Sequence, residues 1–241
     1  MIEIIKKILV PREDFIFGLS DMRGLLHRKF IKYPFGISVG KKLEDGIINE
    51  ITEGPTLRYY QHYNKVNEEL SHIAHKIKSE LQRKGIKAVV IEPTVHTESK
   101  EFEKYLETLT VEVSHKMVAT RAGLGWIGKT DLFISKAFGA RLRLVSLLMD
   151  KEPGSIPKPV EKSYCGKCTV CVDKCPARAA TGQLWNIHIH RDTYFDAHKC
   201  REKCGELAKQ RLGVNIRICG LCVAVCPLGV ARNNFNSTQL Q

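Results

Sequence analysis

The spacing of the cysteines in the last part of the chain limits its fold more than any other sequence feature. The segments "CGKCTVCVDKCP" and "CGLCVAVCP", which begin at residues 165 and 219, contain seven of the nine cysteines. The first has the C-x2-C-x2-C-x3-C-P spacing of bacterial iron–sulfur proteins, and the second repeats its final part. A short loop with this spacing can surround a cubane, and soft thiolates are the ligands that its irons require. The sequence therefore predicts two [4Fe–4S] clusters.

The same spacing predicts how the cysteines divide between the clusters. In two-cluster ferredoxins the last cysteine of each run binds the other cluster. The first cluster is then expected to be held by Cys165, Cys168, Cys171 and Cys226. The second would use Cys175, Cys219 and Cys222, with a fourth ligand from the segment "DAHKCREKC", either Cys200 or Cys204. A structural zinc site needs only two C-x-x-C pairs and would leave the other thiols and both Cys-Pro signatures unexplained.

The residues before these motifs predict an α/β domain. "DFIFGLS" and "KAVVIEP" are typical of strands, and an apolar stripe between them, ended by Gly85, predicts one face of a long helix. His72 and His75 on that helix are expected to be surface or packing residues. We expect an α/β (α+β) domain over 1–150, a proline-rich linker over 151–163 and a ferredoxin-like two-cluster domain over 164–241. The stripe consists of Val66, Leu70, Ile73, Ile77 and Leu81.

Charge and hydropathy give weaker indications. The formal net charge is +12, which favours a polyanionic partner such as RNA. A cluster held by four thiolates carries about −2, so two clusters would reduce the net charge to roughly +8, and part of the basic excess could serve only to offset them. The first residues lack the apolar core of a signal peptide, and we find no window apolar enough for a membrane span. We therefore expect a soluble, cytoplasmic protein.

A glycine-rich stretch, "RAGLGWIGKT" over 121–130, matches both the phosphate-binding loop and the dinucleotide fingerprint. Both sites need a strand before the glycines and a helix after them. Here a helix-like segment comes first and strand-like segments follow, so we expect neither ATP nor NAD to bind. The loop could instead border a cofactor or substrate pocket, or it could be a corner that only lets a helix pack on a sheet. The expected pocket residues are Gly123, Gly125, Trp126, Gly128 and Lys129.

The chain resembles the epoxyqueuosine reductase family of iron–sulfur, cobalamin-dependent tRNA-modifying enzymes and the related reductive dehalogenases. The resemblance rests on "FGLSDMRGLL", "YPFGISVG", "GPTLRYYQHYNKVNEEL", "AGLGWIGK", "FISKAFGARLRLVSLLMD" and both cysteine runs, in that order. It implies that Cys200, in "FDAHKC", completes the second cluster. It also implies that the N-terminal half cradles a corrinoid, with "GLGWIGK" at the edge of that pocket.

One part of the family pattern is missing. Queuosine-forming members carry a proposed aspartate proton donor shortly before "AGLGW", whereas this chain reads "LETLTVEVSHKMVATRAG", without Asp or Pro. His115 and Lys116 lie near the equivalent place. Because a departing epoxide oxygen or leaving group needs a proton, the substrate or the chemistry could differ here.

The resulting functional prediction is an oxidoreductase that passes electrons through two clusters to a bound corrinoid (cobalamin) or directly to a substrate. The alternatives are a two-cluster ferredoxin-type electron carrier without its own substrate, and an iron–sulfur protein that binds nucleic acid without redox turnover. We expect a redox partner such as ferredoxin or flavodoxin, a small-molecule or tRNA substrate, and no membrane association.

Overall fold

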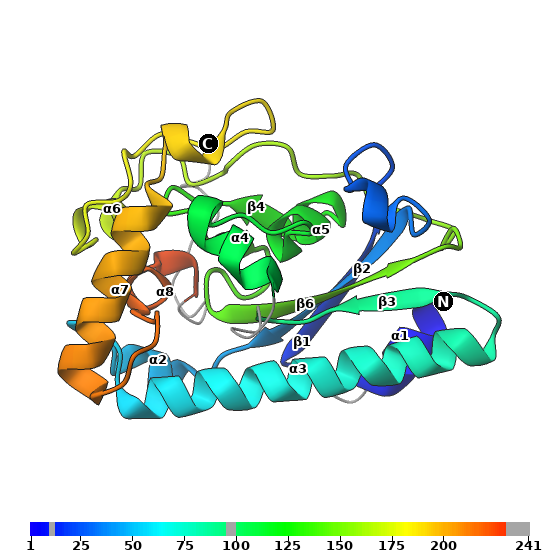
Figure 1. Cartoon of the computed structure of the whole chain (residues 1–241), viewed down its shortest axis with the longest axis horizontal. Coiled ribbons are helices and arrows are strands. Elements are labelled where there is room, and N and C mark those ends of the chain that lie inside the picture. Colours follow the sequence, from blue (N-terminus) through cyan, green and yellow to red (C-terminus); the bar gives the residue numbers. More distant parts are fainter. Residues whose placement is uncertain (10–12, 95–99, 230–241) are drawn as a thin grey trace. The chain divides into compact units, whose positions relative to one another are not determined.

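The computed structural model describes residues 1–9, 13–94 and 100–229, and its chain forms two compact units (Figure 1). The first, here called the sheet unit, comprises Met1–Lys42, Tyr63–Leu124 and Arg143–Val160. The second, the cysteine unit, comprises Leu43–His62, Gly125–Leu142 and Glu161–Gln241. The units therefore alternate along the chain. The predicted ranges 1–150 and 164–241 assigned residues 43–62 and 125–142 to the other part, and as domain boundaries those ranges stay a prediction.

A four-stranded sheet forms the centre of the sheet unit, in the order β1-β2-β6-β3. These strands are β1 (Phe15–Asp21), β2 (Phe35–Lys42), β6 (Leu142–Met149) and β3 (Ala88–Ile91). β1 pairs antiparallel with β2, and β3 pairs antiparallel with β6. The predicted strands in "DFIFGLS", "KAVVIEP" and "RLRLVSLLMD" are confirmed. Most of β6 is buried, as is expected for a strand in the interior of a sheet.

Helices cover both faces of this sheet. On β2, Gly36 faces α5 (His115–Arg121), because a Cβ at this glycine would lie 2.9 Å from Val118. Lys41 faces α3 (Leu57–Arg83), where its Nζ lies 3.3 Å from a carboxylate oxygen of Glu69. Positions 36 and 41 are an odd number of residues apart, so their side chains point to opposite faces of the strand. Figure 1 shows the same arrangement, with α3 running along the side of the strands opposite α5.

The long helix α3 confirms the predicted stripe. Its five predicted apolar residues are at most 5% exposed, and the helix is followed by Gly85 at φ +73°, in the left-handed conformation that commonly ends a helix. His72 and His75 lie on its exposed face, as predicted. The other helices of the sheet unit are α1 (Ile2–Leu9) and α4 (Lys100–Thr108). The N-terminal region is thus mixed α/β.

The cysteine unit consists of short elements joined by loops. Its strands β4 (Gly125–Ile127) and β5 (Phe133–Ser135) form a hairpin, and α2 (Asp45–Asn49) and α6 (Val170–Asp173) both pack against α8 (Leu221–Ala224). The remaining helix is α7 (Ala197–Leu212). Residues 151–161 form neither helix nor strand, as their prolines predicted. None of the helices in the described ranges combines the length and the apolar character that a membrane crossing requires.

Candidate metal centre

All nine cysteines belong to the cysteine unit, and all nine thiols are free. Cys171 lies on α6 and Cys222 on α8, so two of the predicted ligands come from short helices that pack together. Two more thiols, Cys200 and Cys204, lie one turn apart on α7. The remaining thiols lie in loops, which can bend around a compact group: Cys165, Cys168, Cys175, Cys219 and Cys226.

The four predicted ligands of the first cluster lie near one another. Burial is the main reason why the pKa of Cys226 is raised to about 11, and the charges of Cys165 and Cys171 also contribute. The pKa of Cys171 is raised by burial and by the charges of Cys165 and Cys168. Cys226 therefore lies within electrostatic reach of the first run although it is distant in sequence. Their role as ligands remains a prediction.

A second group of thiols surrounds Cys222. Its pKa is raised chiefly by burial and further by the charges of Cys175, Cys171 and Cys219. Cys175, the last cysteine of the first run, therefore lies beside the second run. The exchange of final cysteines that the spacing predicts is compatible with both groups.

The structure places both candidates for the eighth ligand close to Cys219. The Sγ atoms of Cys200 and Cys204 are 3.9 Å apart. Cys204 also hydrogen-bonds the Cys219 thiol, and this is the main reason why the pKa of Cys219 is lowered to about 7. The assignment of Cys200 rather than Cys204 to the second cluster therefore stays a prediction.

This donor set fits two [4Fe–4S] clusters in number and chemistry. One group has four thiols, the other has five, and each cluster needs four thiolates. Binding of the cationic iron would favour the thiolate forms and offset the burial that raises several of their pKa values. Among the residues that the structure describes, no group of three or more His, Cys, Asp or Glu side chains forms a site for a single metal ion.

The glycine-rich stretch leads from the end of α5 into the β4–β5 hairpin, in which Gly125 pairs with Ser135. A Cβ at Gly125 would lie only 2.0 Å from the carbonyl oxygen of Ile134, so the close approach of the strands requires glycine. Gly123 has φ +69°, and a Cβ there would lie 2.9 Å from the Lys158 carbonyl oxygen. The predicted order, helix first and strands afterwards, is confirmed by α5, β4 and β5. Pocket contacts of these residues stay a prediction.

Three side chains of this hairpin are buried in the cysteine unit: Trp126, Lys129 and Thr130. Trp126 is 7% exposed, and its Nε1–H donates to the Sγ of Cys165 at 3.4 Å. Thr130, also buried, lies near Cys171 and Cys222, and its hydroxyl acts to lower the pKa of both thiols. Lys129 is 5% exposed and lies between these two residues in sequence, so it brings a buried positive charge into the cysteine unit. Sequence reasoning missed Thr130; its position directly after "GK" was the available signal.

The segment that replaces the family's proton donor is α5. Its first residue, His115, is partly buried and makes a hydrogen bond with each ring nitrogen. Nε2 lies 2.9 Å from the carbonyl oxygen of Glu92, which can only accept, so Nε2 carries the proton. Nδ1 lies 2.9 Å from the Ser146 hydroxyl and accepts from it. Burial lowers the pKa of His115 to about 4.

Sequence reasoning also missed a buried ion pair in the cysteine unit. The Nη1 atom of Arg141, a residue 1% exposed, donates to the carboxylate of Asp45 at 2.9 Å, and its Nη2 donates to the Ala224 carbonyl oxygen at 3.3 Å. These contacts connect Arg141, which follows β5, to α2 and to α8. Helix α8 carries Cys222. No sequence motif marks this pair, because its members are far apart in the chain.

Comparison with protein families identifies the cysteine runs. Residues 164–229 match the family described as "4Fe-4S double cluster binding domain".

Among curated proteins, the chain is similar to epoxyqueuosine reductases. It is 33% identical to the enzyme of Cyclobacterium marinum over 123 residues, which cover 48% of this chain and 36% of that protein. It is 32% identical to the enzyme of Lactococcus garvieae over 131 residues, which cover 52% of this chain and 34% of that protein. The matched stretch thus spans about a third of the length of these relatives.

Solved structures share the fold. A catabolic reductive dehalogenase superposes with a TM-score of 0.64 at 16% identity, over 88% of this chain and 29% of that chain. An epoxyqueuosine reductase bound to a modified tRNA stem loop superposes with a TM-score of 0.60 at 18% identity, over 100% of this chain and 66% of that chain. The epoxyqueuosine reductase of Streptococcus thermophilus gives a TM-score of 0.58 at 18% identity, over 97% and 66% of the two chains.

Proposed function

We propose that this chain, an epoxyqueuosine reductase-like protein with a 4Fe-4S double-cluster domain and a fold related to reductive dehalogenases, is an iron–sulfur reductase. The observation that carries the proposal is the grouping of thiols across the two cysteine runs, within the residues that match the double-cluster domain. When bound, two [4Fe–4S] clusters supply one-electron transfer. The ligands we propose are Cys165, Cys168, Cys171 and Cys226 for one cluster, and Cys175, Cys200, Cys219 and Cys222 for the other.

The chain's own residues create the surroundings that such a centre needs. Buried side chains of the β4–β5 hairpin exclude water beside the thiols, and Trp126 donates a hydrogen bond to one of them. Buried Lys129 contributes positive charge to a unit that would carry two anionic clusters. Free thiols of this kind persist in a reducing compartment, which supports a cytoplasmic location.

A corrinoid is the electron acceptor that we propose within this function. One of the structural relatives is a reductive dehalogenase for which B12-dependent dehalogenation has been described. We propose that Gly123, Gly125, Trp126, Gly128 and Lys129 border the corrinoid or the substrate. The substrate is either a small molecule or a tRNA, the latter supported by the net charge of +12 and by the tRNA stem loop in one relative. A ferredoxin or flavodoxin would supply the electrons.

The environment of His115 favours a second candidate, an electron carrier without its own substrate. The segment before the glycines has no aspartate, and His115 uses both ring nitrogens in hydrogen bonds within the sheet unit. A carrier needs no proton donor, whereas reduction of an epoxide or a carbon–halogen bond needs one.

Anaerobic reconstitution separates these candidates. The purified protein should contain about eight iron and eight sulfide per chain, twice the content of one cubane. Titration with cob(II)alamin, followed by the visible spectrum, should then reach an end point at one corrinoid per chain, with ATP as the control ligand that produces no change. A protein that holds its iron but leaves the corrinoid spectrum unchanged would be the carrier. Stoichiometric zinc with little sulfide would contradict both.

A further inference from the structure

The hairpin segment Gly125–Thr130 contains the "GKT" sequence of a phosphate-binding loop, yet its indole N–H points at a cysteine thiol. Trp126 donates from Nε1 to the Sγ of Cys165 at 3.4 Å. Its side chain is buried in the cysteine unit, so water does not compete for this contact. The segment therefore has a second possible role, independent of any corrinoid or nucleotide.

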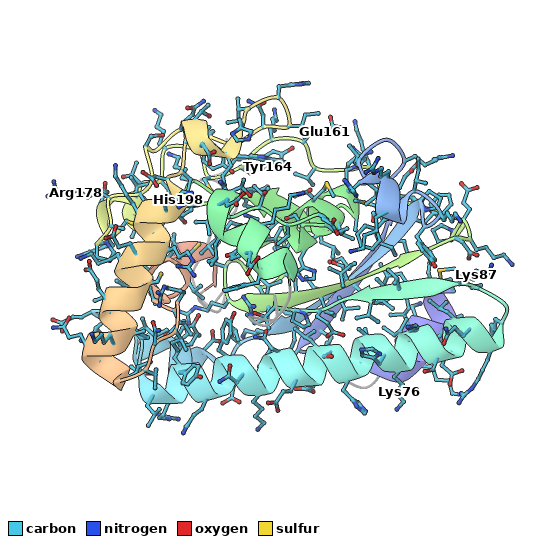
Figure 2. The ribbon with its side chains drawn as sticks, viewed as in Figure 1. Lys76, Lys87, Glu161, Tyr164, Arg178 and His198 are labelled. Atoms are coloured by element: carbon cyan, nitrogen blue, oxygen red, sulfur yellow. The ribbon has the colours of Figure 1, made fainter. Side chains whose placement is uncertain are left out.

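The orientation of Trp126 is fixed on more than one side. Tyr164, labelled in Figure 2, precedes Cys165, and its ring meets the Trp126 ring edge-on at a centroid distance of 5.5 Å. The backbone of Trp126 pairs with Ile134 in the hairpin. Since an indole N–H can only donate, this geometry aims a hydrogen-bond donor permanently at one sulfur.

We propose that Trp126, in the Gly125–Thr130 hairpin segment, sets the reduction potential of one cluster through its hydrogen bond to Cys165. This proposal rests on the proposed function, because it requires the clusters to be bound. Trp126 is a positioning residue, since it acts through a cysteine ligand.

The physical reason is electrostatic. One-electron reduction adds one negative charge to a cluster and its sulfurs, and a hydrogen bond to a sulfur becomes stronger as that charge grows. No covalent bond forms or breaks, and the proton stays on its nitrogen or oxygen. A donor therefore favours the reduced form and raises the potential of the cluster it serves.

The test is an anaerobic dithionite titration of the iron-loaded protein, followed by electron paramagnetic resonance. Trp126→Phe keeps an aromatic ring but loses the donor, and it should reduce the reduction equilibrium constant of one cluster by up to about tenfold, about 59 mV for one electron. Trp185→Phe is the matched control: Trp185 is also buried in this unit, and among the described residues its indole donates to no cysteine sulfur. The control should leave both potentials unchanged.

Unchanged potentials in Trp126→Phe, with full iron content, would overturn the proposal.

A measurement on the unmodified side chains covers the case in which Trp126→Phe loses iron. Protein labelled with ¹⁵N at the indole nitrogens should show ¹⁵N hyperfine coupling to a reduced cluster, and the coupling should persist in Trp185→Phe. Absence of the coupling, or its loss in Trp185→Phe, would contradict the contact. If the wild-type protein holds no iron–sulfur cluster, the proposed function fails first, and iron and sulfide analysis reveals this before any titration.

Discussion

At the scale of single residues, His115 shows how packing can change the meaning of a sequence position. From the sequence it lies near the place of the family's acidic proton donor. In the structure it is a partly buried neutral imidazole that joins α5 to Glu92, just after β3, and to Ser146 on β6. Both nitrogens are engaged, so His115 holds the sheet unit together and has no free nitrogen with which to protonate a ligand.

His115 should make stability depend on pH. Its folded-state pKa of about 4 lies below the ordinary 6.5, so below pH 6.5 the unfolded chain binds a proton that the folded chain does not. The stabilisation is therefore present above pH 6.5 and is lost as the pH falls toward 4. Between pH 7.5 and 5.5 the expected loss is about 1 kcal/mol. Thermal unfolding of iron-loaded His115→Gln should show a smaller acid-dependent decrease than wild type, while His72→Gln, at an exposed position, should match wild type. Equal acid-dependent decreases in thermal stability in the wild type and both variants would contradict this prediction.

At the scale of elements, α7 brings two thiols to the same neighbour. Cys200 and Cys204 are four residues apart and therefore lie on one face of the helix. Asp196 caps the helix by accepting from the backbone N–H of Lys199 at 2.9 Å, and the left-handed Gly213 ends it. The helix thus has defined ends, which hold both thiols close to Cys219. The second cluster needs only one of them as its fourth ligand.

The two serine variants of α7 should therefore differ. If Cys200 is the eighth ligand, Cys200→Ser should lower the iron content or change the paramagnetic resonance signal of one cluster, because a harder oxygen replaces a soft thiolate. Cys204→Ser should retain about eight iron per chain. The opposite result would transfer the ligand role to Cys204. Loss of iron in both variants would mean that the pair supports the cluster jointly.

At the scale of the whole molecule, the sequence predicted the parts better than their grouping. The cysteine spacing predicted the double-cluster domain, and apolar patterns predicted α3, β1, β3 and β6, because local periodicity and ligand spacing leave a signal in the sequence. The grouping of residues 43–62 and 125–142 with the cysteines left no such signal in the sequence. It depends on contacts such as Arg141 with Asp45 and Trp126 with Cys165, between residues far apart in the chain.

This grouping predicts that the C-terminal part is not a separable ferredoxin. A fragment of residues 151–241 keeps all nine cysteines but lacks β4, β5 and α2, and with them Trp126 and the Arg141–Asp45 pair. Its reconstituted iron content should fall well below about eight per chain, and its clusters should be lost faster in air than those of the full chain. A fragment with full iron content and equal lifetime would show that the consecutive division at 151–163 describes the domains better.

The alternation of the two units also has a consequence for the order of events on the ribosome. Residues 43–62 and 125–142 are synthesised before the cysteine runs with which they pack. At roughly 5 to 20 residues per second, several seconds separate the synthesis of Leu142 from that of Gly229. During this interval apolar side chains such as Trp126 and Ile134 have no completed partner surface, and iron has few thiolates to bind. The nascent chain therefore passes through a period in which it can aggregate, and this period lasts at least until the second cysteine run, which ends at Cys226, has emerged.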